Sequence, residues 1–345
     1  MKSFVFPGNI EPDILAIASK QVPYMRTQWF SDLVLESESM LLDLIDCPKG
    51  RVIPYTASGT AAMEACVSEF VSKCRKTLVI NGGTFGARWA NLCRHYNISH
   101  DEFMVEFGKT PDWSLLERQI ETGKYDVLLM QHHETSSGYL YDLEKISEIC
   151  SKNGLFLVVD AISSFLTDYF SMNSFGVDIA IISSQKGLNL PPGLSYTILA
   201  ERVLAKAPFK NGTFYLDWDE HLSNLSRGQT PYSPATHLFM QAHERLCRIK
   251  KTGIGAVIAA VNEKASVFRD KCTEQGVRFS AECMSNCMTG IFLPFSARPF
   301  VDYLLQKNIY ILPCGRSNMI RVAHLGTTTV KDHKDLAEEI DKWGK

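Results

Sequence analysis

An alternation of short apolar runs with amphipathic segments, between about residues 50 and 245, constrains the fold of this chain more than any other feature. The apolar runs span residues 78–80, 126–130, 155–159, 178–182 and 195–199. Amphipathic segments such as 114–121 and 142–152 lie between them. Short, nearly continuous apolar strands that alternate with helices predict an α/β domain, in which helices cover both faces of a mostly parallel sheet. Ligands of such domains bind beyond the carboxyl ends of the strands.

The rest of the chain has a different pattern, which predicts a smaller α+β domain. Residues 233–269 have the pattern of a long helix with a break near Gly253 and Gly255. The elements expected after it are strands at 276–280, 288–293, 310–312 and 319–323 and helices at 299–307 and 330–343. We expect a large domain of residues 14–245 and a small domain of residues 1–13 and 246–345. The first dozen residues show no core pattern, so we expect them on the surface or across the domain junction.

Composition and charge exclude several classes of protein. The 345 residues have a net charge of −2 and are 21% charged, which leaves no basic footprint for nucleic acid or an anionic membrane surface. No segment offers the roughly 18 to 20 uninterrupted apolar residues of a membrane span, and the start MKSFVFPGNIEPD lacks a secretory signal, so we expect a cytoplasmic protein. The ten cysteines are scattered without a CxxC pair, and we predict no metal site.

Lys186 occurs where a buried strand is expected to end, in the stretch SSQKGLNLPPG (183–193). Burying an ammonium group is costly unless a partner or a lowered pKa compensates. Two interpretations of this lysine remain open: a solvated side chain beyond the strand, or a neutral amine that forms a Schiff base.

Two further stretches place polar groups at the same edge of the predicted sheet. Asp160 directly follows the apolar run 155–159, and is either a helix cap or the partner of a protonated ring nitrogen. It precedes Lys186 by 26 residues, about one strand–helix–strand unit, so both are expected at one edge of neighbouring strands. Residues 58–60 in YTASGTAAMEA (55–65) are predicted at a helix N-terminus, which is either a plain cap or a site for an anion such as phosphate.

Several short motifs occur in an order and spacing that resemble one enzyme family. The motifs are SGT (58–60), NGGTFGAR (81–88), HHETSSG (132–138), VDAISSF (159–165), SSQKG (183–187), TPYSPATH (230–237) and IRVAHLG (320–326). Together they resemble the class V, fold type I aminotransferases that depend on pyridoxal 5′-phosphate. The nearest groups are the 2-aminoethylphosphonate–pyruvate and the alanine–glyoxylate or serine–pyruvate transaminases. The resemblance implies a mostly parallel, seven-stranded sheet in the large domain, a smaller α+β C-terminal domain, and a homodimer with shared active sites.

The resemblance also implies a role for each residue that matches a family motif. Lys186 would hold pyridoxal phosphate as a Schiff base, and Asp160 would pair with its ring nitrogen. Phe85 would stack on the ring, where relatives carry Trp or Tyr, and Thr135 would lie near the phenolic oxygen. The phosphate ligands would be Ser58, Gly59, Thr60 and Gln185, with Thr230 and Ser233 reaching the site of the partner subunit. Arg321 would bind the substrate carboxylate, since a guanidinium group can make two parallel hydrogen bonds.

Departures from the family leave the substrates open. At the position before Lys186, Gln185 is similar to the residue of the alanine–glyoxylate group. The motifs NGGTFGAR, HHETSSG and VDAISSF are more similar to those of the phosphonate group. The amino donor therefore stays open among 2-aminoethylphosphonate, alanine and serine, with pyruvate or glyoxylate as the acceptor. One alternative is a lyase or desulfurase of the same fold, which Gln185 disfavours because a histidine is expected at its position. The other alternative is a relative that binds the cofactor without turnover.

Four more residues have two interpretations each. Arg26 and Arg316 are either extra contacts for an anionic substrate or solvated surface charges. His132 and His133 could be metal ligands, but adjacent side chains on a strand point to opposite faces, so we expect packing or supporting polar roles.

Overall fold

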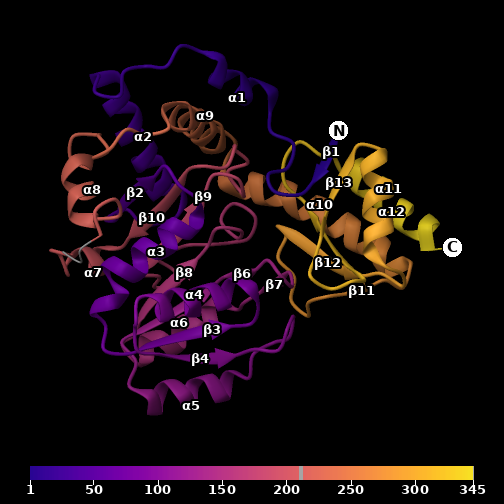
Figure 1. Ribbon diagram of the computed structural model, residues 1–345, viewed down its shortest axis with the longest axis horizontal. Coiled ribbons are helices and arrows are strands. Elements are labelled where there is room, and N and C mark those ends of the chain that lie inside the picture. The colour runs from indigo at the N-terminus through magenta and orange to yellow at the C-terminus, as the bar shows by residue number, and fades with distance from the viewer. Residues whose placement is uncertain (210–212, 345) are drawn as a thin grey trace.

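The computed structural model describes residues 1–209 and 213–344, and it contains two principal sheets, each with its own helices (Figure 1). The large sheet has seven strands in the order β2-β10-β9-β8-β5-β3-β4. In that order the strands span Arg51–Tyr55, Ser195–Leu199, Ile179–Ser183, Phe156–Asp160, Val127–Gln131, Thr77–Asn81 and His100–Met104. β10 is antiparallel to both of its neighbours, and the other pairings are parallel. The predicted α/β fold with a mostly parallel sheet is confirmed.

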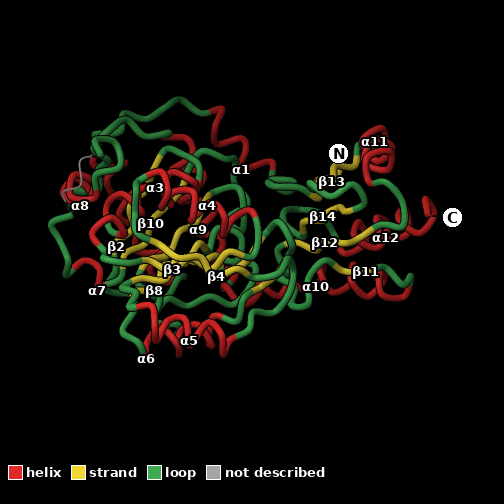
Figure 2. Tube along the Cα trace, turned by 60° about the horizontal axis from the view of Figure 1, so that its bottom comes forward, coloured by secondary structure: helices red, strands yellow, loops and turns green. Residues whose placement is uncertain are grey.

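Helices lie on both sides of the large sheet, as Figure 2 shows. The helices of this part of the chain are α1 (Pro12–Ala16), α2 (Gln28–Leu44), α3 (Gly59–Glu69), α4 (Thr84–His95), α5 (Trp113–Gly123), α6 (Leu143–Lys152), α7 (Glu201–Leu204), α8 (Trp218–Leu225) and α9 (Thr236–Thr252), with 3₁₀ turns at Ile17–Ser19 and Val71–Lys73. Every residue of β3, β5, β9 and β10 is buried, as a sheet covered on both faces requires. Of the helices in the described ranges, none combines the length and apolarity needed to span a membrane.

The sequence located the five interior strands of the large sheet within one residue at each end, but it missed both edge strands. β2 contains Pro54, which cannot donate a ladder hydrogen bond and is tolerated at an edge. In β4 only Phe103 is buried. β4 therefore lacks the continuous apolar run of an interior strand, whereas residues 52–55 of β2 are buried and its run is interrupted by Pro54.

The carboxyl ends of the parallel strands bring the sequence motifs together. β3 leads into NGGTFGAR, and β5 leads into HHETSSG, which forms the hairpin of β6 (His133–Glu134) and β7 (Tyr139–Leu140). β8 ends at Asp160, and β9 ends three residues before Lys186. Motifs that are far apart in the chain therefore share one edge of one sheet, where ligands of such folds bind.

The second sheet has the strand order β1-β13-β14-β12-β11. Its strands are Lys2–Phe4, Ile309–Pro313, Met319–Ala323, Met288–Phe292 and Arg278–Phe279, and its helices are α10 (Ile254–Glu274), α11 (Ala297–Gln306) and α12 (Val330–Gly344). The predicted helix break occurs at Gly253, whose φ of +88° suits glycine. Of the two places expected for the first dozen residues, the surface and the domain junction, the surface is wrong for β1. β1 pairs with β13, and Phe4 is fully buried in the core of this part, although three residues are too few to show a strand period.

Candidate active site

Lys186 and Asp160 lie at the carboxyl edge of neighbouring parallel strands. Asp160 is the last residue of β8 and stands opposite Ile181 of β9. Lys186 follows β9 in a tight turn, in which its carbonyl oxygen accepts the Asn189 N–H at 2.8 Å. The next residue, Gly187, packs so closely that a Cβ there would lie 2.0 Å from a backbone carbonyl oxygen. The two side chains are therefore held at the same edge, as the strand pattern predicts.

The surroundings of Lys186 disfavour its charged form. Burial lowers the pKa of Lys186 to about 8; Cys287 and Asp160 oppose that shift, whereas the charges of Arg321 and Arg88 add to it. An amine with a pKa near 8 is partly neutral at physiological pH, and only the neutral amine is a nucleophile. This environment favours the Schiff-base interpretation of Lys186 over that of a solvated surface lysine.

Asp160 is a buried carboxylate that fits a cationic partner. It is 5% exposed, and its Oδ1 accepts the Ile162 N–H at 2.9 Å. Burial raises the pKa of Asp160 to about 7, although the bond from Ile162 and the charge of Arg88 act in the opposite direction. A cation against this carboxylate would restore its ionised form. A protonated pyridine nitrogen is such a cation.

The predicted helix start at residues 58–60 is present and is open to a ligand. α3 begins at Gly59, and the N-cap residue Ser58 makes no side-chain capping bond. Backbone N–H groups and the dipole at such a helix start favour an anion. A Cβ on Gly59 would lie 3.5 Å from the Cβ of Ser183, so the start of α3 adjoins the end of β9. There, Oγ of Ser183 and Oε1 of Gln185 are buried and have no hydrogen-bond partner in the described part of the chain.

Arg88 belongs to this site, although the sequence did not single it out. Its guanidinium group, on α4, lies 4.7 Å from the centroid of the Phe85 ring, and Nη1 donates to Oγ1 of Thr60 at 3.0 Å. The charge of Arg88 acts on both Asp160 and Lys186. Arg88 thus joins the predicted ring platform to the predicted phosphate loop. Its place within NGGTFGAR was the one signal that could have identified it.

Glu134 holds the loop that carries Phe85. Its fully buried carboxylate accepts the N–H groups of Phe85 at 3.2 Å, Gly86 at 3.1 Å and Ser136 at 3.1 Å. Phe85 and Gly86 belong to the first turn of α4, where N–H groups lack helical partners and a negative charge is favourable. Glu134 therefore fixes Phe85 relative to the next residue of HHETSSG, Thr135.

Replacing Glu134 with alanine is expected to lower the free energy of unfolding by roughly 2–4 kcal/mol, because one buried and two partly buried N–H groups lose a charged acceptor. Urea unfolding of the purified variants measures this change. Glu144→Ala, at an exposed position in the first turn of α6, is the matched control and should change stability by less than about 0.5 kcal/mol. Equal losses in both variants would contradict the role given to Glu134.

Arg321 comes from the second sheet and reaches the edge of the large one. It lies on β14, and its Nη1 donates to the carbonyl oxygen of Thr135 at 3.1 Å, while Nη2 donates to that of Pro313 at 3.4 Å. Nε is buried and has no partner among the residues that the structure describes. Burial lowers the pKa of Arg321. A partly buried guanidinium group with an unused donor is suited to an anionic ligand.

Thr135 lies beside Arg321, whereas the segment of Thr230 and Ser233 lies beside Arg26. Oγ1 of Thr135 and Oγ of Ser163 are 2.8 Å apart, beside Arg321. Thr230 belongs to a segment held by Arg26, whose Nη1 donates to the Thr230 carbonyl oxygen at 2.7 Å. Ser233 is exposed on the same segment. Arg26 therefore contacts the segment expected to reach the partner subunit.

The remaining candidates are engaged in local packing. The guanidinium group of Arg316 lies 4.2 Å from the centroid of the Phe107 ring. The His132 ring packs 5.7 Å from that of Phe170. Burial lowers the pKa of His132 to about 3 and that of His133 far below its usual range, so both are neutral at physiological pH. Over residues 1–209 and 213–344, no group of three or more metal-binding side chains occurs.

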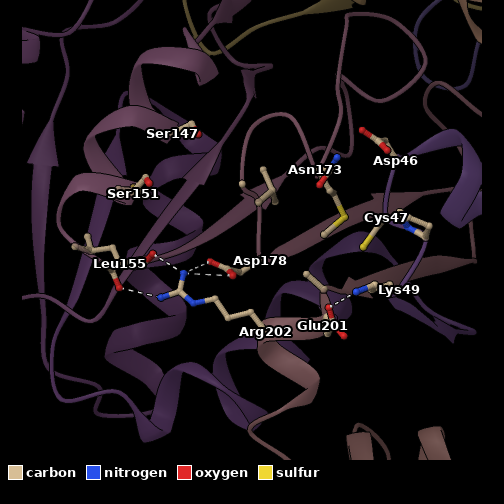
Figure 3. Close-up of a pocket in the computed structure, with 17 residues that line it drawn as sticks. Asp46, Cys47, Lys49, Ser147, Ser151, Leu155, Asn173, Asp178, Glu201 and Arg202 are labelled. Carbon is tan, nitrogen blue, oxygen red and sulfur yellow. Dashed lines mark hydrogen bonds and ion pairs between the residues drawn. The ribbon is translucent and has the colours of Figure 1, made fainter.

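A cavity of about 640 Å³ lies at the opposite edge of the large sheet, near the starts of β8 and β9 (Figure 3). Arg202 on its wall donates to the carbonyl oxygens of Leu155 at 3.1 Å and Gly154 at 2.9 Å and pairs with Asp178 at 3.2 Å. Lys49 pairs with Glu201 at 3.3 Å. These two cations are thus occupied by the protein itself, unlike Arg321 with its unused Nε.

Comparison with known proteins places the chain in a family. Residues 21–274 match the family model for aminotransferase class V. The chain is 29% identical to an uncharacterized aminotransferase of Methanocaldococcus jannaschii, over 94% of this chain and 88% of that protein. It is 26% identical to the soluble hydrogenase 42 kDa subunit of Anabaena cylindrica, over 93% of this chain and 87% of that protein. It is also 26% identical to the 2-aminoethylphosphonate–pyruvate transaminase of Pseudomonas fluorescens, over 80% and 78%.

Solved structures share the whole fold. A subgroup IV aspartate aminotransferase from Thermus thermophilus superposes with a TM-score of 0.91 at 22% identity, over 99% of this chain and 97% of that one. An alanine–glyoxylate aminotransferase from Nostoc sp. superposes with a TM-score of 0.90 at 22% identity, over 97% of this chain and 93% of that one. The family model covers more than half of the chain, and the architecture is that of fold type I. The chain therefore belongs to the class V aminotransferase family and is a pyridoxal-phosphate-dependent aminotransferase.

Proposed function

We propose that this aminotransferase moves the amino group of 2-aminoethylphosphonate, alanine or serine to pyruvate or glyoxylate, with pyridoxal 5′-phosphate bound at Lys186. The observation that carries the proposal is the partly neutral amine of Lys186 beside the buried carboxylate of Asp160, on neighbouring strands. A cofactor with a pyridine ring and a phosphate fits the residues around them. The open start of α3 and the unpaired hydroxyl of Ser183 suit the phosphate, and Asp160 suits the ring nitrogen.

Each predicted site residue has a place in this proposal. The phosphate is held by Ser58, Gly59, Thr60 and Gln185, and Arg88 adds positive charge beside Thr60. Phe85 stacks on the ring, in a position that Glu134 fixes, and Thr135 lies near the phenolic oxygen. Arg321 binds the acidic group of the substrate. Arg26 positions the segment of Thr230 and Ser233, which reaches the site of the partner subunit.

The chain's own residues handle protons and charge during the reaction. Pyridoxal phosphate, when bound, supplies an electron sink for the negative charge that develops on the substrate carbon. Lys186 would hold the cofactor through its amine, and the same amine, once free, would move a proton at the substrate carbon. Asp160 keeps the ring nitrogen protonated. Arg321 orients the substrate so that the proton to be moved lies within reach of Lys186.

Absorption spectra of the purified protein with pyridoxal phosphate test this function, after separate additions of 2-aminoethylphosphonate, alanine, serine and aspartate. We expect the band of the lysine-bound cofactor, and its conversion to the amine form by one of the first three donors. If native protein forms no such band, the cofactor assignment fails. Conversion by aspartate alone would refute the proposed donors, and a band that no donor converts would indicate a relative without turnover.

Arg321→Lys is expected to raise the KM for the oxo acid roughly tenfold while changing kcat less. A lysine keeps the charge but loses the two-pronged hydrogen bonding of the guanidinium group, so binding of the acidic group weakens in ground state and transition state alike. Steady-state kinetics with pyruvate and glyoxylate measure the two constants. Arg298→Lys, at an exposed position on α11, is the control. An unchanged KM in Arg321→Lys would count against the assignment.

We further propose a homodimer whose two active sites are shared between the subunits. We also propose a division into a large domain (14–245) and a small domain (1–13 and 246–345). The last residue, Lys345, lies outside the described residues. The two principal sheets support the division, since β1 joins the second sheet. Within the chain, Arg26 holds the segment of Thr230 and Ser233, which the family resemblance assigns to the partner's site. A monomer in sedimentation velocity, at concentrations where the enzyme is active, would contradict the dimer.

A further inference from the structure

Phe6 lies directly over the amine of Lys186. The distance from Nζ of Lys186 to the centroid of the Phe6 ring is 3.4 Å. Phe6 belongs to the segment that leaves β1 and crosses toward α1, which is the indigo stretch near the N-terminus in Figure 1. A residue near the start of the chain therefore forms part of the wall around the reactive nitrogen.

The segment of Phe6 is fixed on both sides. The Ser3 N–H donates to Oδ1 of Asn9 at 2.7 Å, and the Asn9 carbonyl oxygen accepts from the Thr327 N–H at 2.9 Å and from Nδ2 of Asn189 at 3.1 Å. Gly8 packs so tightly that a Cβ there would lie 2.4 Å from the carbonyl oxygen of Leu325. Asn189 belongs to the turn of Lys186, so the segment is tied to the same turn that positions the reactive amine.

The ring of Phe6 presents an apolar surface to the site. Its other neighbours form a buried apolar cluster of Val261, Cys287, Met288 and Leu325. A substrate substituent that points toward this wall has no polar partner there, and a charged substituent would lose its hydration without compensation. A long substituent would collide with a ring whose backbone cannot easily move.

Arg321 is the cation at this edge that has a buried donor without a partner among the described residues. Arg321 has a free Nε, whereas Arg88 is stacked on Phe85 and bonded to Thr60. Arg316 is stacked on Phe107. Lys186 itself reacts and cannot serve as an anchor. A second acidic group that points toward Phe6 would therefore meet an apolar wall without a cation to pair with it.

We propose that Phe6 is a specificity-determining residue, which restricts the substrates to those with one acidic group and a short, uncharged substituent. This inference rests on the proposed function, since it concerns the substrates of the same site. Pyruvate and glyoxylate meet both conditions, and so do alanine and serine. Dicarboxylates such as aspartate and oxaloacetate do not.

The test uses the full-length enzyme converted to its pyridoxamine phosphate form, so that no amino donor has to be known. Single-turnover rates are measured with pyruvate, 2-oxobutanoate, 2-oxopentanoate and oxaloacetate. In the native enzyme, the single-turnover rate with 2-oxopentanoate should be at least roughly tenfold lower than the rate with pyruvate. Phe6→Ala should raise the ratio of the first rate to the second about tenfold, because room for added methylene groups changes discrimination by about this factor. Phe295→Leu, in which a ring that packs on Phe300 is changed away from the site, is the control and should keep the native ratio.

A second measurement reports on the contact itself. The pH dependence of chemical labelling of Lys186, followed by mass spectrometry before cofactor is added, gives the pKa of its amine. Phe6→Leu keeps the bulk but removes the aromatic face that favours the cation, and it should lower this pKa by about half a unit. An active native enzyme with the same substrate ratio in Phe6→Ala would overturn the inference and leave the proposed function intact. A native enzyme that converts none of the oxo acids, pyruvate included, would overturn both.

Discussion

Replacing Lys186 with alanine is expected to abolish transamination and the absorption band of the lysine-bound cofactor, while the chain stays folded. The loss in turnover should be roughly a thousandfold or more, because the variant lacks both the covalent anchor and the amine that moves the proton. The fold should tolerate the change, because the lysine side chain makes no contribution to the two cores. Its ammonium group is instead a cost to the folded state, since burial lowers its pKa.

The same variant should change how stability depends on pH before cofactor is bound. The pKa of Lys186 is lowered from 10.5 to about 8 in the folded chain. Between about pH 8 and 10.5 the unfolded chain keeps a proton that the folded chain has released, so the free energy of unfolding rises with pH across that window. Lys186→Ala should lack this rise. Urea unfolding at pH 7.5 and 9.5 measures it.

Lys251→Ala, at an exposed position near the end of α9, serves as the control for Lys186→Ala. It should keep the absorption band, the turnover and the native dependence of stability on pH. Turnover retained in Lys186→Ala would refute the role of this lysine, whatever the fold of the variant. An unfolded variant, detected by circular dichroism, would show instead that the lysine side chain is structurally required.

Asp160→Asn is expected to slow the half-reaction with the amino donor by roughly a hundredfold to a thousandfold, the loss typical of removing a charge placed to stabilise a transition state. Asparagine has nearly the same shape, and its carbonyl oxygen can still accept the Ile162 N–H. It carries no negative charge, however, and cannot hold a proton on the ring nitrogen. Stopped-flow absorption after mixing with the donor measures the rate.

Stability should move in the opposite direction from activity in Asp160→Asn. In the folded chain the pKa of Asp160 is raised from 3.8 to about 7. Between those values the folded chain holds a proton that the unfolded chain has lost, so the free energy of unfolding falls as pH rises. Without cofactor, the variant should be more stable than native protein at pH 8, by up to about 4 kcal/mol, and the difference should vanish near pH 4.

The control for this variant is Asp302→Asn, an exposed residue on α11 that pairs with Arg298 of the same helix. Its rate should equal that of the native enzyme, and its stability should change by less than about 0.5 kcal/mol at any pH. If the half-reaction of Asp160→Asn were as fast as that of the native enzyme, the proposed pairing of this carboxylate with the ring nitrogen would be refuted.

The interior of the fold could be predicted from the sequence because burial on both faces leaves a continuous apolar run. β10 (Ser195–Leu199) and β14 (Met319–Ala323) occur at the predicted residues. The strands that escaped prediction have weaker local patterns: Pro54 interrupts β2, and only Phe103 of β4 is buried. β2 and β4 are edges of the large sheet, and β1 is an edge strand of three residues. Their pairing depends on neighbours that are far away in the chain.

The sequence by itself determined the order of the motifs, and with it the family and the residues Lys186 and Asp160. Asp160 ends one strand and Lys186 follows the next by three residues, and the apolar pattern of both strands is local. Only the tertiary structure decided which side chains meet at those residues. Arg88 reaches Thr60, Glu134 caps α4, and Phe6 covers Lys186. Each of these contacts joins segments that are distant in the chain, and no local pattern of hydrophobicity or turn residues encodes such a distance. Two of them form at the carboxyl edge of the large sheet, and the contact of Phe6 with Lys186 joins the segment after β1 to the turn after β9.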